Sequence, residues 1–393
     1  MILSKIPNSF LLRNVSIAAL FASTLSACIT DENPNDEEYR LDEINFSHYE
    51  SDTEIVRPES GIIVDNYLYV VLQKFSNEWT PEPGIIAVID TTTNEEVDTD
   101  ETIEGIQPIY LDVSNPSEII YQPELEKLFI QASGNVFQAE DVRYSAGGIV
   151  TIDVNTFETE LLIDDSSETL NIYNMAIVSD ELGYYVGYAG WEDNSIFEFN
   201  PTTGSVANIS ALNNKNISDI EIDKNEKLWV AITDVDDSGI YIVDTTTNEI
   251  DGEIIPTILP PQNITFISIS PIETTEESES LAIISTYNFG DGGEHVTISV
   301  DEKRTLSDPL VETLSTDFRF VSYEDYFFKL DISIDSIQRF SNLTPETVVD
   351  EQSILGDDVS ANPHDMVFVS NTKAYILRYD ARNIWIVNPA IGE

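Results

Sequence analysis

Short runs of four to seven β-branched and aromatic residues follow one another from Tyr39 to the end of the chain. Turn-forming Asp, Asn, Gly, Pro and Ser residues separate these runs every 8 to 12 residues. This spacing of apolar runs and turns is typical of strands in all-β domains. No stretch of helical length keeps apolar residues at a 3.6-residue period, so the pattern predicts an all-β fold.

One hexapeptide occurs twice in the chain. The sequence Asp90-Thr-Thr-Thr-Asn-Glu95 returns letter for letter at residues 244–249. Each copy follows a short apolar run, at residues 84–89 and 239–243. Identity over six residues in the same context indicates an internal repeat rather than a single active-site motif.

Weaker copies of this unit extend over the rest of the chain, each with three predicted strands that end at an Asp, Asn or Ser turn. The predicted strands are 62–64, 68–72 and 85–90; 118–121, 127–131 and 148–153; 174–178, 184–188 and 195–200; 218–222, 227–232 and 239–244; 264–269, 281–285 and 295–301; 318–322, 326–331 and 336–341; and 365–369, 374–379 and 383–388. The turn residues are Asp90, Asp153, Asn200, Asp244, Asp301, Ser341 and Asn388, which lie 40 to 63 residues apart. A side-chain oxygen at such a turn can bond the backbone two residues on. The following segment, for example Val97–Thr99 or Glu253–Ile255, would be a fourth, outer strand.

Seven four-stranded units predict a seven-bladed β-propeller, because a single sheet cannot bury both of its faces and blades stacked around an axis can. The chain ends soon after the third strand of the seventh unit, and residues 40–47 alternate like a strand before the first unit. Pairing of this N-terminal strand with Ile384–Asn388 would complete blade seven and remove exposed sheet edges. The alternative is that residues 40–47 are a loop.

The units resemble those of YVTN-type propellers, the surface-layer and quinoprotein-like seven-bladed group. Leu68-Tyr69-Val70 leads to Ile89-Asp90-Thr91-Thr92-Thr93-Asn94, and Leu228-Trp229-Val230 leads to Val243-Asp244-Thr245-Thr246-Thr247-Asn248. The resemblance covers nearly all of residues 40–393, and units five and six diverge most. It implies a fold and a frequent extracytoplasmic location, but no single activity, because one fold serves many functions.

The N-terminus predicts export and lipidation. Lys5 and Arg13 precede an apolar run at residues 15–25 that is too short to span a bilayer, as in a secretory signal. The segment Leu25-Ser26-Ala27-Cys28 resembles the lipobox of bacterial lipoproteins, in which the cysteine becomes the lipidated N-terminus. The alternative is a chance cysteine in a signal for soluble export. By resemblance to Gram-negative sorting rules, Ile29 after the cysteine favours the outer membrane over the inner one.

These features predict three parts: a signal peptide at residues 1–27, an acidic tether at 28–38 and one propeller domain at 39–393. Cys28 is the only cysteine, so no intramolecular disulfide can form. The protein is expected to be a monomer that contacts the membrane through its lipid and faces the periplasm or the cell exterior.

The 393 residues include 72 acidic and 18 basic side chains, a net charge of −54. A nucleic-acid partner is therefore excluded, because binding phosphate requires Lys and Arg. The acidity is explained by a solvated surface that keeps the protein soluble. Diffuse binding of Ca²⁺ or of cationic groups is the alternative.

Three acidic residues are candidates for a binding site at one mouth of the channel. Asn115-Pro-Ser-Glu118 and Asn362-Pro-His-Asp365 share the pattern Asn-Pro-x-acid before a first strand, and Asp219 occupies a similar place. First strands line the channel of a propeller, so these acids could hold a cation or an amine. Alternatively, Asn-Pro forms the turn between blades and each acid bonds a neighbouring backbone amide.

Aromatic residues in two equivalent loops are the second candidate. Trp79 lies between the second and third strands of unit one, and Tyr188 and Trp191 lie at the same place in unit three, with Glu192 and Asp193 beside them. Exposed aromatic loops on a rigid scaffold often carry binding sites, here for a sugar or a peptide. The alternative is that these rings fill gaps between blades.

Metal and catalytic motifs are weak. Asp234 and Asp236 begin a segment similar to a calcium loop, but Thr245 stands where a bidentate Glu is required, so Ca²⁺ is only a weak candidate and a strand-connecting turn is favoured. Residues 288–294 are Gly-rich, but no Lys-Ser/Thr follows, which favours a wide hairpin over a phosphate loop. His364, beside Asp365, is the one plausible catalytic histidine, although a solvent-facing role is favoured.

These observations predict a lipid-anchored envelope propeller that serves as a non-catalytic binding or scaffold module for a protein, peptide or glycan, without a required cofactor. The alternative is a propeller enzyme, a metal-assisted hydrolase or lyase that uses the carboxylates at the channel mouth. Convergence of His364, Asp365, Asp219 and Glu118 within ligand reach would favour the enzyme. Acids already bonded to backbone amides would favour the binding module.

Overall fold

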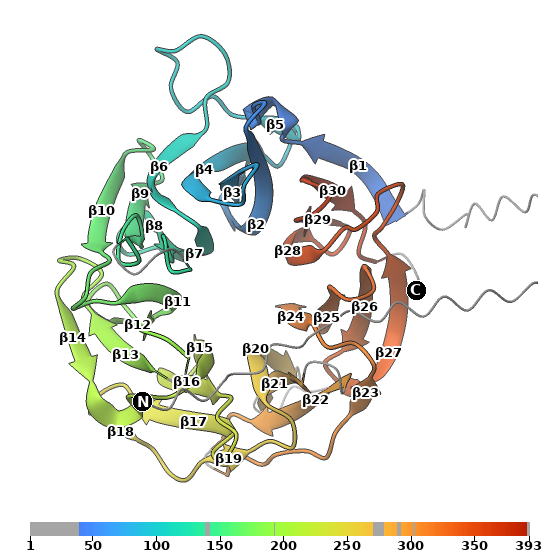
Figure 1. Ribbon diagram of the computed structural model, residues 1–393. Coiled ribbons are helices and arrows are strands. Elements are labelled where there is room, and N and C mark those ends of the chain that lie inside the picture. Colours follow the sequence, from blue (N-terminus) through green and yellow to red (C-terminus); the bar gives the residue numbers. More distant parts are fainter. Residues whose placement is uncertain are drawn as a thin grey trace, which may run out of the picture. The chain divides into compact units, whose positions relative to one another are not determined.

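A computed structural model describes residues 39–137, 142–191, 193–269, 279–288, 292–301 and 303–390. All of them belong to one compact unit, Asn35–Glu393, in which antiparallel sheets surround a central axis as the seven blades of a β-propeller (Figure 1). The all-β, seven-bladed prediction is confirmed. The predicted signal peptide, Cys28 and the acidic tether lie outside the described residues. Among the described residues, no helix has the length and apolar character needed to cross a membrane.

Within each blade, the strands follow one another from the central axis of the ring to its outer rim. Blade one contains β2 (Glu54–Val64), β3 (Tyr67–Ser76), β4 (Pro81–Asp90), β5 (Glu95–Glu96) and β6 (Ile109–Ser114). Blade two contains β7 (Pro116–Gln122), β8 (Lys127–Ala132), β9 (Gly148–Asp153) and β10 (Thr159–Asp164). Blade three contains β11 (Asn171–Ile177), β12 (Gly183–Tyr188), β13 (Asn194–Phe199) and β14 (Val206–Ile209). Blade four contains β15 (Ile217–Ile222), β16 (Lys227–Ile232), β17 (Gly239–Asp244), β18 (Glu249–Ile250) and β19 (Ile255–Pro256).

The remaining blades keep this order. Blade five contains β20 (Pro261–Ile269), β21 (Glu279–Asn288), β22 (Gly292–Ser299) and β23 (Val311–Thr313). Blade six contains β24 (Phe318–Tyr323), β25 (Tyr326–Asp331), β26 (Ser336–Ser341) and β27 (Thr344–Ser353). Blade seven contains β28 (Pro363–Ser370), β29 (Lys373–Arg378), β30 (Asn383–Val387) and, from the other end of the domain, β1 (Arg40–Asn45). Within the described residues, two short 3-10 helices, η1 (Ser47–Tyr49) and η2 (Ser210–Leu212), join strands.

The repeated hexapeptide forms the turn between the third and fourth strands. In the first copy, the Asp90 carboxylate accepts the backbone N–H of Thr92 at 2.7 Å, and in the second copy Asp244 accepts that of Thr246 at 2.9 Å. All seven predicted turn residues accept the N–H two residues on, at 2.7 to 3.3 Å: Asp90, Asp153, Asn200, Asp244, Asp301, Ser341 and Asn388. The predicted role of these side chains is therefore confirmed.

The N-terminal strand closes the ring. β1 pairs antiparallel with β30, from Arg40 opposite Val387 to Asn45 opposite Asn383, so the predicted closure of blade seven is confirmed. Phe46 follows β1 and is fully buried in the cluster between blades seven and one, together with Leu68 and Tyr375. Closure therefore combines backbone pairing with apolar burial.

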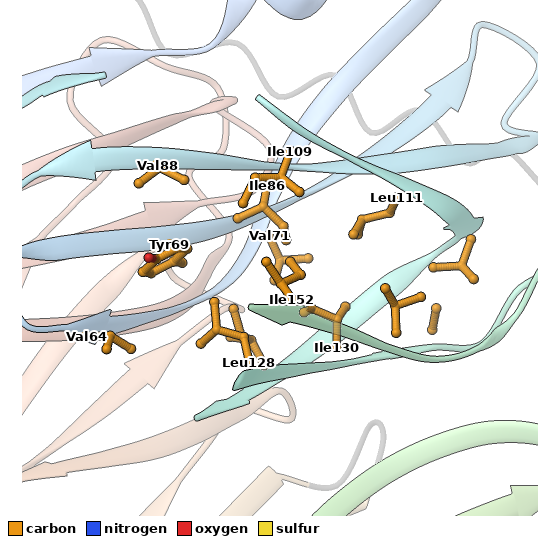
Figure 2. Packing of buried hydrophobic residues seen from close by; sticks show 14 residues of the cluster. Val64, Tyr69, Val71, Ile86, Val88, Ile109, Leu111, Leu128, Ile130 and Ile152 are labelled. Carbon is orange, nitrogen blue, oxygen red and sulfur yellow. The ribbon is translucent and has the colours of Figure 1, made fainter. Parts of the chain in front are cut away.

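The core consists of apolar layers between neighbouring blades. Figure 2 shows the layer between blades one and two, where Tyr69, Val71 and Ile86 of blade one face Leu128 and Ile130 of blade two. The second and third strands supply most of these residues, because they are covered on both faces. Continuous apolar runs are expected for such strands.

The predicted outer strand at Val97–Thr99 is wrong. Blade one instead has β5 before this segment and β6 after it, and the connection between them projects from the rim (Figure 1). The Asp98 carboxylate accepts the backbone N–H groups of Asp100 and Gln107 at 3.2 and 3.0 Å, which turns the chain away from the ladder. In blade four, Glu253 and Ile254 lie outside strands and the ladder resumes at Ile255.

Candidate functional site

One end of the ring gathers most of the predicted site residues. Because consecutive strands of a blade are antiparallel, the loop between its second and third strands and the connection into its first strand lie at the same end. We call this the mouth end, and its described loop residues are 77–80, 133–137, 142–147, 189–191, 193, 233–238 and 379–382. Trp79 and Trp191 occupy two of these loops, as predicted, with 59% and 75% of their surfaces exposed.

The three predicted acids occupy equivalent positions on first strands. Glu118, Asp219 and Asp365 each follow a break in register between the first and second strands of their blade. Such a bulge re-aims the neighbouring side chains. Asn115 and Asn362 adopt positive φ angles of 57° and 51° before two of these strands, as Asn tolerates better than most residues.

Each of these carboxylates accepts a backbone N–H from the following blade. Glu118 accepts that of Met175 at 2.6 Å, Asp219 accepts that of Ile264 at 2.7 Å, and Asp365 accepts that of Gly61 at 2.9 Å. We call these contacts the interblade hydrogen bonds. Of the two interpretations of the Asn-Pro-x-acid pattern, the bond to a neighbouring amide is the one observed. The role of these residues in ligand binding stays a prediction.

Burial and mutual repulsion alter the ionisation of the channel acids. Burial raises the pKa of Glu118 to about 8, and the negative charge of Asp219 adds to the rise. Burial also raises the pKa of Asp219 to about 6, although Asn174 donates to it at 3.0 Å. Burial raises the pKa of Asp365 above its ordinary value. These groups therefore hold protons more strongly than free carboxylic acids.

Sequence reasoning missed two further charged residues of the channel. Glu221 lies two residues after Asp219 on β15, and burial together with the charges of Asp219 and Glu118 raises its pKa well above the ordinary value. Arg319, on β24, is the cation whose charge opposes these rises at Glu118, Asp219 and Asp365. The two-residue period of a strand could have identified Glu221, whereas the position of Arg319 depends on the ring.

A second group joins Trp79 to His364 across blades one and seven. The Arg57 guanidinium lies 4.7 Å from the Trp79 ring and 4.8 Å from the Tyr379 ring, and it pairs with Asp380. Tyr379 stacks on His364, with 4.2 Å between ring centroids. The layers therefore run from Trp79 through Arg57 and Tyr379 to His364, and we call them the Arg57 stack.

His364 is not the solvent-facing residue that the sequence favoured. Its Nδ1 lies 2.9 Å from Glu59 Oε2, and its side chain is only 16% exposed. Glu59 and His364 are the residues that the register breaks skip in blades one and seven. Because these two blades are neighbours, the two bulges bring the carboxylate and the imidazole together.

A third group surrounds Tyr188 at blades two and three. The Arg143 guanidinium lies 5.5 Å from the Tyr188 ring and 5.4 Å from the Tyr144 ring, and Tyr173 lies 5.5 Å from Tyr188. Burial, the neighbouring Tyr188 and the charge of Glu59 raise the pKa of Tyr173. Glu59, whose carboxylate lies 2.9 Å from His364, therefore also acts on this third group through its charge.

The calcium-like segment forms the turn between β16 and β17, as the sequence favoured. Asp234 accepts the backbone N–H of Asn216 at 2.9 Å, and Lys215 lies 3.4 Å from Asp234 and 2.6 Å from Asp237. Asp236 is exposed. Across the parts of the chain that the structure describes, no three His, Cys, Asp or Glu residues are arranged to hold a metal ion.

A cavity of about 820 Å³ lies at the opposite end of the ring, between blades four and five. Lys227 and Arg304 line it, and both pair with Asp251, at 3.9 and 2.6 Å. The cavity contains none of the predicted site residues.

Comparison with known proteins supports the fold alone. No family model matches the chain, and no curated protein matches it. Streptogramin B lyase is similar in structure, with a TM-score of 0.55, 12% identity and coverage of 89% of this chain and 97% of that chain. YCF48 bound to D1 peptide has a TM-score of 0.54, 8% identity and coverage of 88% and 94%. The β-propeller domain of Cps50 (Swd1) from Myceliophteria thermophila also has a TM-score of 0.54, with 10% identity and coverage of 88% and 98%.

Proposed function

We propose that the protein is a non-catalytic binding module that presents the mouth end of its propeller to a protein partner. The interblade hydrogen bonds are the observation that carries this proposal. Glu118, Asp219 and Asp365 each accept a backbone N–H of the next blade, so their carboxylates support the ring. A hydrolase or lyase mechanism would instead need these groups to face the substrate.

The side chains that remain available at the mouth end suit a protein interface. Trp79 and Trp191 are largely exposed, and Tyr188 and Arg143 are half-buried. Trp, Tyr and Arg are the residue types most enriched among the strongest contributors to protein–protein binding. Trp79, Arg143 and Trp191 stand on loops held by a rigid ring, where binding residues are often found, and Tyr188 is the last residue of β12.

The similar structures include both classes of function, a lyase and a protein bound to a peptide. The fold is therefore compatible with an enzyme and with a binding module. The His364–Glu59 pair is the feature that favours an enzyme, because a carboxylate can orient an imidazole for proton transfer. Stacking on Tyr379 and the low exposure of His364 favour a structural role for this pair.

Aromatic and histidine variants separate the two functions. Envelope proteins and glycans are presented to the purified full chain, to Trp79→Ala with Trp191→Ala, and to His364→Gln. We expect the double variant to lose partner binding by about 10-fold or more, as for truncated aromatic anchors. Val235→Ala is the matched control, because Val235 is 92% exposed in another loop of the mouth end.

The enzyme would be established instead if the double tryptophan variant bound its partner as the parent does and if turnover of a substrate were lost in His364→Gln.

We propose that the protein is anchored to the bacterial envelope through lipid on Cys28, with the outer membrane favoured. Each buried methylene of a lipid chain contributes about 0.8 kcal/mol, and two or more chains give stable anchoring. Cys28→Ser is expected to move the protein from the membrane fraction to the soluble fraction and to abolish incorporation of labelled fatty acid. Retention of both properties would refute lipidation.

A further inference from the structure

We propose that the segment recognised at the mouth end is cationic: an Arg- or Lys-bearing stretch of a partner protein whose basic groups lie against Trp79 and Trp191. This inference rests on the proposed binding function and adds the chemical class of the ligand. The features that carry it are the acids beside the exposed rings, the cation–π contacts already formed there, and the charge of the whole chain.

Acidic side chains flank both exposed tryptophans. Trp79 has an exposed neighbour, Glu78, and the half-buried Glu82 stands three residues on. Trp191 is 75% exposed, and the exposed Asp193 lies two residues away. A cation is attracted to the negative face of either ring, and the nearby acids in the sequence add to this attraction. A neutral sugar would use the ring but gain little from the acids.

The aromatic rings of the mouth end already bind guanidinium groups of the protein itself. Arg57 lies between Trp79 and Tyr379, and Arg143 contacts Tyr188 and Tyr144. Asp380 neutralises Arg57, so this internal cation adds no net positive charge to the stack. Because Trp79 is 59% exposed beside this contact, its free surface is available to a second guanidinium or ammonium group.

The charge of the chain favours the same class of ligand over long distances. A net charge of −54 attracts basic partners and repels nucleic acids and acidic glycans. Charge complementarity of this kind mainly increases the rate of encounter and excludes wrong partners. It cannot by itself locate a binding site, so the aromatic residues must provide the specific part of the affinity.

The four tryptophans make the site directly observable. Trp229 and Trp385 are buried, with 1% and 5% exposure, whereas Trp79 and Trp191 are exposed. A change in tryptophan emission on titration with a peptide therefore reports mainly on the mouth end. The probes are an eight-residue peptide with alternating Arg and Ser, its citrulline analogue, its Glu analogue and a neutral glucan oligosaccharide.

We expect saturable binding of the Arg peptide to the full chain, with one site by calorimetry. The citrulline analogue should bind about 10-fold more weakly, which corresponds to about 1.4 kcal/mol. The double variant Trp79→Ala with Trp191→Ala should weaken binding of the Arg peptide by a similar factor. The double variant Glu78→Gln with Glu82→Gln should weaken this binding several-fold. Glu124→Gln with Glu158→Gln is the matched control, because both acids are exposed at the end of the ring opposite the mouth end. These two substitutions remove the same amount of charge.

Equal weakening by the two glutamate pairs, with no effect of the tryptophan variant, would mean diffuse attraction to an acidic surface and would overturn the proposal. Binding of the glucan alone, lost in the tryptophan variant, would overturn the cationic class and leave the binding function intact. Failure of every probe to depend on Trp79 or Trp191 would overturn both.

Discussion

Glu118 lines the channel and accepts the backbone N–H of Met175 in the next blade. Burial raises its pKa from the ordinary 4.5 to about 8, so the folded protein keeps this proton to a higher pH than the unfolded chain does. The stabilising contribution is therefore complete below about pH 4.5 and is lost as the pH rises through about 8. The ionised form would lie beside Asp219 and Glu221.

Glu118→Gln removes this ionisation and leaves a side-chain oxygen that can still accept the Met175 N–H. We expect the variant and the parent to melt at similar temperatures near pH 4.5, and the variant to melt several degrees higher at pH 8. Thermal unfolding between these pH values measures the difference. Glu124→Gln, at an exposed site, is the control, and parallel curves for Glu118→Gln and the parent would refute the argument.

At the scale of single residues, local chemistry could be predicted from the sequence and long-range contacts could not. The turn at Asp90 requires only a hydrogen bond from the backbone N–H two residues later, and this local relation can be predicted from the sequence. The Arg57 stack requires Tyr379, which is 322 positions away and reaches Arg57 only because the ring closes. The burial of His364 has the same cause, since its partner Glu59 belongs to the other end of the chain.

At the scale of elements, the N-terminal strand contributes more than a sheet edge. Phe46 is fully buried between blades seven and one, where it packs in the same cluster as Val56, Leu68 and Ile384. Removing a buried Phe side chain usually costs about 3–5 kcal/mol, because transfer energy is lost and a cavity remains. A substitution here should therefore weaken ring closure without touching the mouth end.

We expect Phe46→Ala to lower the melting temperature strongly, and deletion of residues 39–48 to lower it further. Leu41→Ala, in the preceding strand β1, is the control, because Leu41 is 54% exposed, and exposed substitutions usually change stability by less than about 0.5 kcal/mol. Differential scanning calorimetry measures all three proteins. An unchanged melt for both Phe46→Ala and the deletion would show that β1 does not hold the ring.

The inner strands were predicted better than the outer ones, and the reason is physical. β9, β16 and β17 coincide with their predicted limits, because strands covered on both faces need continuous apolar runs. The outer strand has one solvated face and a weak pattern, so one residue can end it. Asp98 does this by bonding Asp100 and Gln107 in place of the ladder.

At the scale of the whole molecule, the number of blades followed from the repeat, whereas the position of the acids relative to one another did not. Glu118 and Asp219 belong to blades two and four, yet the charge of Asp219 raises the pKa of Glu118. The charges of both residues raise the pKa of Glu221. Convergence on a central axis produces this coupling. The same convergence places the Arg319 guanidinium within electrostatic reach of Glu118, Asp219 and Asp365, which belong to three different blades.

The net charge of −54 makes stability depend on salt. Like charges destabilise a compact state, and the screening length falls from about 10 Å at 0.1 M salt to about 3 Å at 1 M. We therefore expect the melting temperature to rise steadily with NaCl over this range. Calcium and magnesium chlorides, compared at matched ionic strength, show whether screening is the whole effect.

We expect Ca²⁺ and Mg²⁺ to give equal shifts, because the best-placed carboxylates already have partners within the protein. Asp219 accepts two backbone N–H groups, from Ile220 and Ile264, and Lys215 lies between Asp234 and Asp237 as an internal cation. A rise of many degrees with Ca²⁺ and little with Mg²⁺ would contradict this expectation. Such a result would mean that carboxylates rearrange to coordinate Ca²⁺, whose oxygen coordination is flexible. Lys215→Met would then distinguish a Ca²⁺ site at Asp234 from one among the channel acids. Removing the Lys215 ammonium should strengthen Ca²⁺ binding at Asp234 and leave binding in the channel unchanged.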